Sequence, residues 1–452
     1  MSDFLFSEFD EVSSKQWKQQ IQFELKGADY NEVLVWKSDE GINVKPFYHA
    51  DEFTENFAPI PGFPTNWSVC QNIFIDDVNV ANQLAIDAVN RGAEALFFSA
   101  SKPFDVEKLN ESIDLNKVAI YFDFQFLNSD FISTIRNFYT SKNTTIFILN
   151  DIIGNLARNG NWFKNLEQDF EVLNSIVKEV PDNMSLISVD VSLYQNAGAT
   201  MVQQLAYALA HVNEYLNREV TLVITFKIAV GSNYFFEIAK LRALRILFAA
   251  LAEEYGVNPE CHILAMPSKR NKTLYDYNVN MLRTTTECMS AVLGGANAVC
   301  NLPYDALYHK SNEFGERISR NQLLILKAES YFDTVSNPAD GSYYIESLTQ
   351  QLAEKALVLF KEIEKNGGFL KQLKDGTIQK KIKESAAKEQ QLFDKNEKVL
   401  IGTNKHPNKD DRMKHDLELY PFVKTHPRKT LIEPIIERRL AEKMEQERLE
   451  KE

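Results

Sequence analysis

Eight β-rich segments alternate with helical patterns between about residue 67 and residue 335, and this alternation predicts an α/β fold. A parallel sheet with crossover helices produces such a pattern, and a closed βα barrel requires eight strands. The chain has 452 residues, of which 44% are hydrophobic, so it can bury a barrel of about 250 residues and still supply flanking segments. A doubly wound open sheet also alternates, but the count of eight favours an eight-stranded βα (TIM) barrel with an N-terminal arm and a C-terminal helical extension.

Short apolar runs give the strands, and apolar residues at helical spacing give the helices between them. The strands are expected at residues 68–75, 95–99, 118–124, 144–149, 185–191, 222–228, 262–266 and 298–302. Helices are expected at residues 78–90, 129–139, 162–177, 200–216 and 279–293, with Gly or Asn punctuation between segments.

One further helix is expected directly after the sixth strand, because Gly231 and Asn233 interrupt the strand pattern and Asn233 can cap a helix. Its broad apolar face consists of Tyr234, Ile238, Leu241, Leu244, Phe248, Leu251 and Tyr255. The polar residues Glu237, Lys240, Arg242 and Arg245 fall outside that face.

The segments that flank the barrel divide the chain into three parts. Residues 1–60 form an N-terminal arm, residues 61–335 form the barrel, and residues 336–452 form C-terminal helices with a charged tail. In the arm, a helix at 14–25 carries the apolar stripe Trp17, Ile21 and Leu25, which must pack against something. After the barrel, helices are expected at 345–364, 369–373 and 377–393, an extended strap at 406–428, and a solvated or frayed helix at 437–452.

Composition excludes several classes of function. A formal net charge of -13 argues against general nucleic-acid binding, because phosphate contacts require a basic footprint. Cys70, Cys261, Cys288 and Cys300 lie far apart without CxxC spacing, which favours reduced, packed thiols over a zinc or redox site. Apolar runs are too short to span a membrane, and the acidic start lacks the basic region of a signal peptide. A cytoplasmic or matrix-like location is therefore expected.

The wording of several segments resembles one enzyme family. Residues 229–245 read Ala-x-Gly-x-Asn-x-Phe-x-Glu-Ile-Ala-Lys-Leu-Arg-Ala-x-Arg, similar to the barrel of the adenosylcobalamin-dependent acyl-CoA mutases, the methylmalonyl-CoA mutase family. Further similar motifs, in the family's order, lie at residues 40–48, 67–71, 195–200, 317–321, 337–346 and 399–405. The resemblance covers roughly residues 15 to 440. It implies a carbon-skeleton rearrangement of an acyl-CoA, in which cobalamin supplies the difficult chemistry.

The resemblance also shows which catalytic features are missing. None of the seven histidines stands in the family's cobalt-binding Asp-x-His-x-x-Gly motif, and the roughly 50 residues after Asn404 are expected to be too few for a cobalamin domain. Leu193 stands where the family has the histidine that contacts the thioester, Cys70 stands where it has an arginine, and Cys300 lies in an altered last strand. The family's catalytic tyrosine is absent from residues 59–64. We therefore expect no catalytic, cofactor-binding or metal-binding residues in this chain.

Bulky side chains are expected to fill the barrel, so that no pantetheine arm can pass through it. The residues expected to provide this bulk are Leu193, Cys70, Ile73, Phe226 and Val299. Polar residues near strand ends leave other functions open. Lys227 could be a Schiff-base lysine, although a side chain that points to water or pairs with a carboxylate is the simpler interpretation. Asp123 is expected to point into the barrel. Acid or base roles are open to the strand-end residues Asp123, Asp151, Asp190 and Asp305, but helix capping is the commoner role for such aspartates.

The resemblance, combined with the lost site, implies a non-catalytic small subunit. It would pair barrel against barrel with a large catalytic subunit that carries adenosylcobalamin and binds the acyl-CoA, with Trp17, Ile21 and Leu25 at the interface. Neither nucleic acid nor a membrane is expected as a partner. Two alternatives remain open: a self-sufficient barrel enzyme such as a lysine-dependent aldolase, and a mutase chain that uses a separate cobalamin-binding polypeptide.

Overall fold

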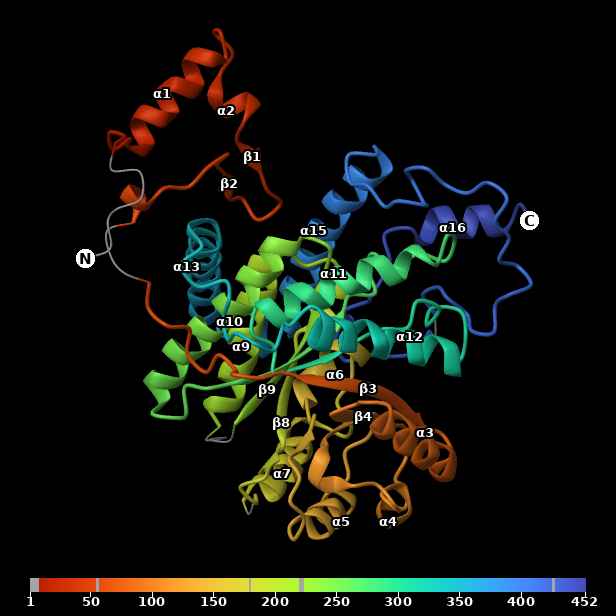
Figure 1. Cartoon of the computed structure of the whole chain (residues 1–452). Helices are drawn as coiled ribbons and strands as arrows, with labels where there is room; N and C mark the ends of the chain where they lie inside the picture. The colour runs from red at the N-terminus through yellow and green to blue at the C-terminus, as the bar shows by residue number, and fades with distance from the viewer. Residues whose placement is uncertain (1–7, 54–56, 179, 219–222, 425–426) are drawn as a thin grey trace.

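The computed structural model describes residues 8–53, 57–178, 180–218, 223–424 and 427–452, and its centre is a parallel barrel (Figure 1). Nine strand segments form one sheet in the order β7-β6-β5-β4-β3-β11-β10-β9-β8. A single residue, Leu186, separates the two end strands β7 and β8, so together they make one interrupted strand that closes the ring. The predicted eight-stranded βα barrel is thus confirmed.

The strands lie close to their predicted positions. Their bounds are β3 Ser68–Ile75, β4 Ala95–Ala100, β5 Ala119–Phe124, β6 Ile146–Ile148, β7 Met184–Ser185, β8 Ile187–Asp190, β9 Ile224–Val230, β10 His262–Pro267 and β11 Ala298–Cys300. Of the strand expected at 222–228, the first residue lies outside the described part of the chain, and β9 extends two residues beyond the expected end.

Helices surround the barrel and cover its outer face. Their bounds are α3 Val78–Asn90, α4 Val106–Leu109, α5 Ser129–Tyr139, α6 Ile152–Asn159, α7 Leu166–Val177, α8 Ser192–Asn196, α9 Met201–Leu216, α10 Tyr234–Tyr255, α11 Val279–Leu293 and α12 Glu313–Leu324, which continues as a π-helical turn over Ile325–Glu329. The main hydrophobic core lies between these helices and the strands. Because the strands pack against this core, their ends, where barrel proteins build their sites, are held in fixed positions.

Helix α10 is buried more completely than its sequence suggests. Glu237, Lys240, Arg242 and Arg245, expected outside the apolar face, are all buried, because α9 and α13 (Tyr343–Lys365) pack against α10 as well. Glu237, Lys240 and Arg242 form ion pairs inside the protein, and Arg242, for example, donates to Glu346 over 2.6 Å. Arg245 donates instead to backbone carbonyls and to Asn297. Asn233 occupies the expected N-cap position of α10, but its side chain accepts no hydrogen bond from the helix.

The arm stands away from the barrel in Figure 1. It consists of α1 Ser14–Glu24, α2 Tyr30–Val33, β1 Trp36–Lys37 and β2 Asn43–Val44, and the two short strands pair as an antiparallel hairpin. Aromatic rings attach the arm to the start of α13. Phe53 stacks on Tyr343 and Tyr48 packs on Tyr344, with ring centroids 5.3 Å apart in both pairs.

The C-terminal part continues from α13 into α14 Phe369–Lys374 and α15 Thr377–Asp394, close to the predicted helices. The expectation of a solvated or frayed tail is wrong. Helix α16 (Glu442–Leu449) buries Glu445, which accepts a hydrogen bond from the Leu274 amide and pairs with Arg439 over 2.5 Å. Part of the charge in this tail is therefore paired inside the protein.

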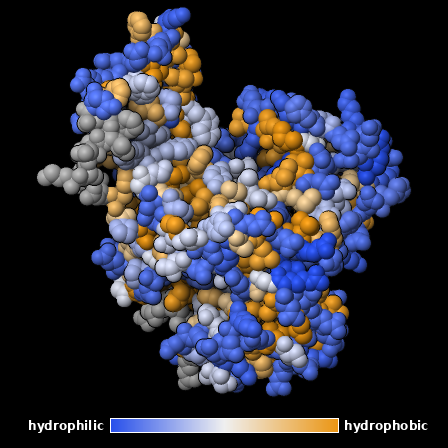
Figure 2. Space-filling view, viewed as in Figure 1, coloured by the Kyte–Doolittle hydropathy of each residue, from blue (hydrophilic) through white to orange (hydrophobic). Residues whose placement is uncertain are grey.

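The surface is hollowed between the arm and the C-terminal part (Figure 2). This hollow is a cleft between the arm and the C-terminal part. Residues that follow the carboxyl ends of β8, β9 and β10 line it. Within the described residues, no helix has both the length and the apolar character needed to cross a membrane.

Candidate functional site

Five charged side chains form an alternating chain at the carboxyl end of the barrel, where barrel proteins place their chemistry. Lys227 on β9 donates to Asp123 on β5 over 2.7 Å and pairs with Asp190 on β8 over 3.1 Å. Arg158 on α6 donates to Asp190 over 2.7 Å and to Glu437, from the C-terminal segment, over 2.5 Å. We call these five residues the mouth ion chain.

The ion pairs of the mouth ion chain keep Lys227 and Asp190 charged. Burial opposes the charge of Lys227, but the carboxylates of Asp123 and Asp190 outweigh it and raise the pKa of the ammonium. Burial likewise opposes ionisation of Asp190, whereas Lys227 and Arg158 lower the pKa of its carboxyl well below the usual range. A Schiff-base lysine needs a lowered pKa. Lys227 has the opposite shift, so the simpler interpretation, pairing with carboxylates, is confirmed.

The expectations for the strand-end aspartates hold in part. Asp123 points into the barrel, as its contact with Lys227 shows. Asp151 caps α6 by accepting from the Gly154 amide over 2.7 Å, and it also accepts from Tyr215 and contacts His211. Asp305 instead contacts His309 and Asn312 beyond β11. Asp123, Asp151 and Asp305 therefore each have a partner for their carboxylate.

Below the mouth, aromatic rings fill the barrel. Tyr121 stacks on Phe147 at 4.6 Å, Phe147 stacks on His262 at 4.0 Å, and the Tyr121 hydroxyl lies 2.8 Å from His262 Nε2. Burial lowers the pKa of His262 to about 3, so its ring is neutral. Cys70 and Cys300 lie at the same register of neighbouring strands in this cluster.

The residues expected to fill the barrel were only partly the right ones. Cys70 lies inside, but Ile73, Phe226 and Val299 belong to the core between the strands and the helices, because successive strand residues face opposite sides. Leu193 is 1% exposed and belongs to that same outer core. Phe97, Tyr121, Phe147 and Leu264 supply the interior bulk instead.

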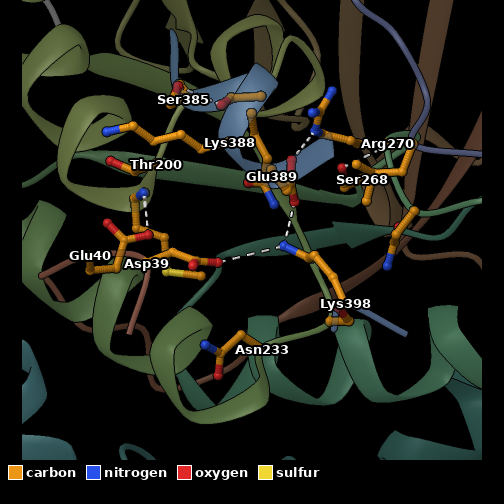
Figure 3. Close-up of a pocket in the computed structure, with 18 of the residues that line it drawn as sticks. Asp39, Glu40, Thr200, Asn233, Ser268, Arg270, Ser385, Lys388, Glu389 and Lys398 are labelled. Atoms are coloured by element: carbon orange, nitrogen blue, oxygen red, sulfur yellow. Dashed lines mark hydrogen bonds and ion pairs between the residues drawn. The ribbon is translucent and has the colours of Figure 1, made fainter. Parts of the chain in front are cut away.

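A cleft of about 470 Å³ lies beside the mouth, between the arm, the start of α9 and helix α15 (Figure 3). Arg270 and Lys398 both contact Glu389 across it, and Lys398 also approaches Asp39 of the arm at 3.8 Å. Glu40, from the same hairpin, accepts hydrogen bonds from the first amides of α9. The polar groups in this cleft tie the arm and the C-terminal part to the barrel.

Of the residues proposed for a partner interface, Trp17 and Ile21 lie on α1, and Leu25 is its C-cap. The structure describes all of α1, and none of its residues is buried. Trp17 is 49% exposed, and Ile21 and Leu25 are half-buried. Phe23 on the same helix is 80% exposed. The apolar stripe is therefore not buried against the chain's own barrel.

Sequence reasoning missed Arg158, Glu437 and Glu40. Glu437 lies within an apolar pattern, with Ile432, Ile435 and Leu440 around it, and that pattern was the available signal for burial. Arg158 lies on a helix that was not expected, and Glu40 acts through a contact 161 residues away. Among the described residues, no group of three or more His, Cys, Asp or Glu side chains is arranged to hold a metal ion.

Comparison with known proteins points to one family. The family model described as methylmalonyl-CoA mutase matches residues 99–450. A methylmalonyl-CoA mutase small subunit of Porphyromonas gingivalis is 33% identical over 445 residues, which cover 89% of this chain and 71% of that protein. A small subunit of Streptomyces virginiae is 27% identical, with 89% and 72% covered. A methylmalonyl-CoA mutase of Rhizobium meliloti is 29% identical, and the match spans 88% of this chain but only 64% of that protein.

Proposed function

Because the chain belongs to the methylmalonyl-CoA mutase family, we propose that it is the small subunit of a heterodimeric methylmalonyl-CoA mutase. The assembly would interconvert methylmalonyl-CoA and succinyl-CoA in the cytoplasm. In this proposal the large subunit performs catalysis, and the present chain stabilises it by pairing barrel against barrel. Two relatives that are named small subunits support the assignment, and each match covers 89% of this chain.

The mouth ion chain is the observation that carries the non-catalytic role. A general acid, base or nucleophile needs a group that is free to exchange a proton or attack. Here Lys227, Asp190 and Arg158 are bound to one another by short ion pairs, and in the aromatic layer beneath them the lowered pKa of His262 keeps its ring neutral. The polar groups of this barrel are engaged in structural contacts, which favours a retained scaffold over an active site.

The family depends on adenosylcobalamin, but several histidines of this chain are committed to internal contacts. His211 is buried and contacts Asp151, and His262 is half-buried and contacts the Tyr121 hydroxyl. His49 and His309 pair with aspartates close by in the sequence, His406 and His415 are exposed, and His426 lies outside the described residues. We propose that adenosylcobalamin enters the assembly through the large subunit alone.

Purification of the chain from its native host under mild conditions tests the proposal. Mass spectrometry should identify one larger mutase chain in equal amount, and the complex should convert methylmalonyl-CoA to succinyl-CoA. Lys227→Ala in this chain should leave that turnover unchanged, because Lys227 takes part in no step. Turnover by the isolated chain, or a borohydride-trapped substrate adduct on Lys227, would overturn the assignment in favour of a self-sufficient enzyme.

A further inference from the structure

Glu40 lies at the tip of the arm hairpin and reaches the barrel. The Gly41 amide donates to the Ser38 carbonyl, and the Ser38 amide donates to the Ile42 carbonyl, each over 3.0 Å, which closes the turn between β1 and β2. Gly41 adopts a φ of 66°, a left-handed conformation that glycine allows without strain. This tight turn projects the Glu40 side chain towards α9.

The Glu40 carboxylate caps α9 from outside that helix. The amides of Met201 and Val202 donate to its two oxygens, each over 2.8 Å. Thr200 accepts from the Gln203 amide, and Gln203 Oε1 accepts from the Thr200 amide in return. The first amides of a helix have no partner within it, so the arm satisfies two donors that α9 cannot satisfy itself. The negative charge also interacts favourably with the helix dipole.

Two apolar residues of the hairpin, Ile42 and Val44, are buried in the main hydrophobic core, whereas its remaining polar and aromatic contacts with the barrel are weaker than those of Glu40. Asp39 and Lys398 are 3.8 Å apart, near the limit of an ion pair. Trp36 meets Phe236 edge-on at 5.6 Å and remains 50% exposed. Further along the arm, the rings of Tyr48 and Phe53 rest on the start of α13. Glu40 is therefore the hairpin's strong polar anchor, and the rings hold the far end of the arm.

We propose that Glu40 is a latch that fixes the arm against the N-terminus of α9 and thereby sets the direction in which α1 presents its apolar residues to a partner. The partner half of this inference rests on the proposed function, whereas the latch itself does not. Release of the latch leaves the hairpin attached through the buried Ile42 and Val44 and through the aromatic contacts of the arm, but it frees the turn at Glu40 and so loosens the direction of the segment that precedes it. Glu40 acts here as a positioning residue, because its contacts are with the chain's own backbone.

Hydrogen exchange on the isolated chain tests the latch. Glu40→Ala should speed exchange at the amides of Met201 and Val202 by about tenfold, the effect of losing a helix cap. Glu40→Gln keeps the size of the side chain and one acceptor oxygen, so a smaller increase is expected. Glu32→Ala, at an exposed glutamate of the same arm, is the matched control and should change neither amide. Unchanged exchange in Glu40→Ala, with the native circular dichroism spectrum retained, would overturn the latch.

Binding to the large subunit tests the second half. Glu40→Ala should weaken the heterodimer by about ten- to a hundredfold in Kd, and Glu40→Gln should weaken it less, because the arm no longer starts from the bound orientation. Faster exchange with an unchanged Kd would retain the latch but overturn its role in presenting the arm. Absence of any complex even with the natural chain would instead contradict the proposed function and leave the exchange result standing.

Discussion

Arg158 and Glu437 are 279 residues apart in the sequence, yet their guanidinium and carboxylate groups approach within 2.5 Å. Backbone hydrogen bonds support this contact on both sides, from the Ile435 amide to the Ala157 carbonyl over 2.8 Å and from the Arg438 amide to the Asn196 carbonyl over 3.1 Å. The C-terminal segment is thus built into the rim of the barrel, and Glu437 completes a chain of charges that begins inside it.

The first prediction concerns this contact. Glu437→Ala leaves Arg158 with Asp190 alone, so the free energy of unfolding should fall by about 1 to 2 kcal/mol. Both side chains are about one-third exposed, which keeps the cost below that of a fully buried pair. Urea denaturation measures the change. Glu450→Ala, at an exposed glutamate of the same tail, should stay within about 0.5 kcal/mol. Equal effects of the two substitutions would contradict a structural role for Glu437.

The second prediction concerns pH. Burial raises the pKa of Glu316 to about 7, although Ser311 and Gln71 donate hydrogen bonds to its carboxylate. A carboxyl whose pKa is raised in the folded state stabilises the fold most below its unfolded value near 4.5, and this contribution is lost as pH rises towards 7. Glu316→Gln should therefore gain stability relative to the natural chain between pH 5 and pH 8.

Thermal melts across that pH range measure the effect. The difference in Tm between Glu316→Gln and the natural chain should grow with pH and level off above pH 7. Glu313→Gln, on the same helix but exposed, provides the control and should show no such trend. A pH-independent difference for Glu316→Gln would show that the Glu316 carboxyl titrates at its ordinary pKa.

The third prediction separates the two roles of the arm. A chain that starts at residue 36 loses α1 and α2 but keeps the hairpin and Glu40, whereas one that starts at residue 46 loses Glu40 as well. Both should weaken the heterodimer, because both lack Trp17, Ile21 and Leu25. Only the chain that starts at residue 46, which lacks Glu40, should show faster hydrogen exchange at the first amides of α9. If sedimentation showed unchanged heterodimer formation by the chain that starts at residue 36, the apolar stripe would have no role at the interface.

Local sequence pattern was sufficient to predict the barrel. Strand β3 was located at its exact bounds and α15 within one residue, because runs of period two and period 3.6 are properties of neighbouring residues. Alternation in eight units, together with the family resemblance, then predicted closure, and the single interruption at Leu186 does not change the count of strands around the ring.

The contacts that fix the charged groups could not be predicted in the same way. Lys240 and Arg242 carry charges, and a helix pattern places such residues in water unless a second layer covers them. That layer is α13 over Arg242 and the α8–α9 segment over Lys240. The mouth ion chain likewise joins strands β5, β8 and β9 to a tail whose charge density suggested solvent. Such pairings depend on tertiary contacts, about which local periodicity carries no information.

The fourth prediction follows from the histidines. The purified chain alone should bind no adenosylcobalamin, because His211 and His262 are committed to contacts inside the protein. Equilibrium dialysis with adenosylcobalamin measures this directly, and the complex with the large subunit is the positive control. One-to-one binding of adenosylcobalamin by the isolated chain at micromolar concentration would contradict the prediction.

The last prediction concerns restoration of the lost site. Leu193 stands where the family has a histidine, and it is 1% exposed on a five-residue helix whose residues are all buried. Leu193→His should cost about 1 to 3 kcal/mol, because the imidazole is buried there without a designed hydrogen-bond partner. Leu193→Met, which keeps volume and polarity, should cost less than about 1.5 kcal/mol.

Leu193→His should also restore no turnover, even beside a cobalamin-bearing large subunit whose own site has been inactivated. An eight-stranded barrel is just wide enough for its own side chains to fill. Here Tyr121, Phe147 and His262 stack across the interior, so a pantetheine arm has no path to a restored histidine. The assay is formation of succinyl-CoA from methylmalonyl-CoA. Measurable turnover from this single substitution would mean that the aromatic layer opens, and that the barrel retains a substrate channel.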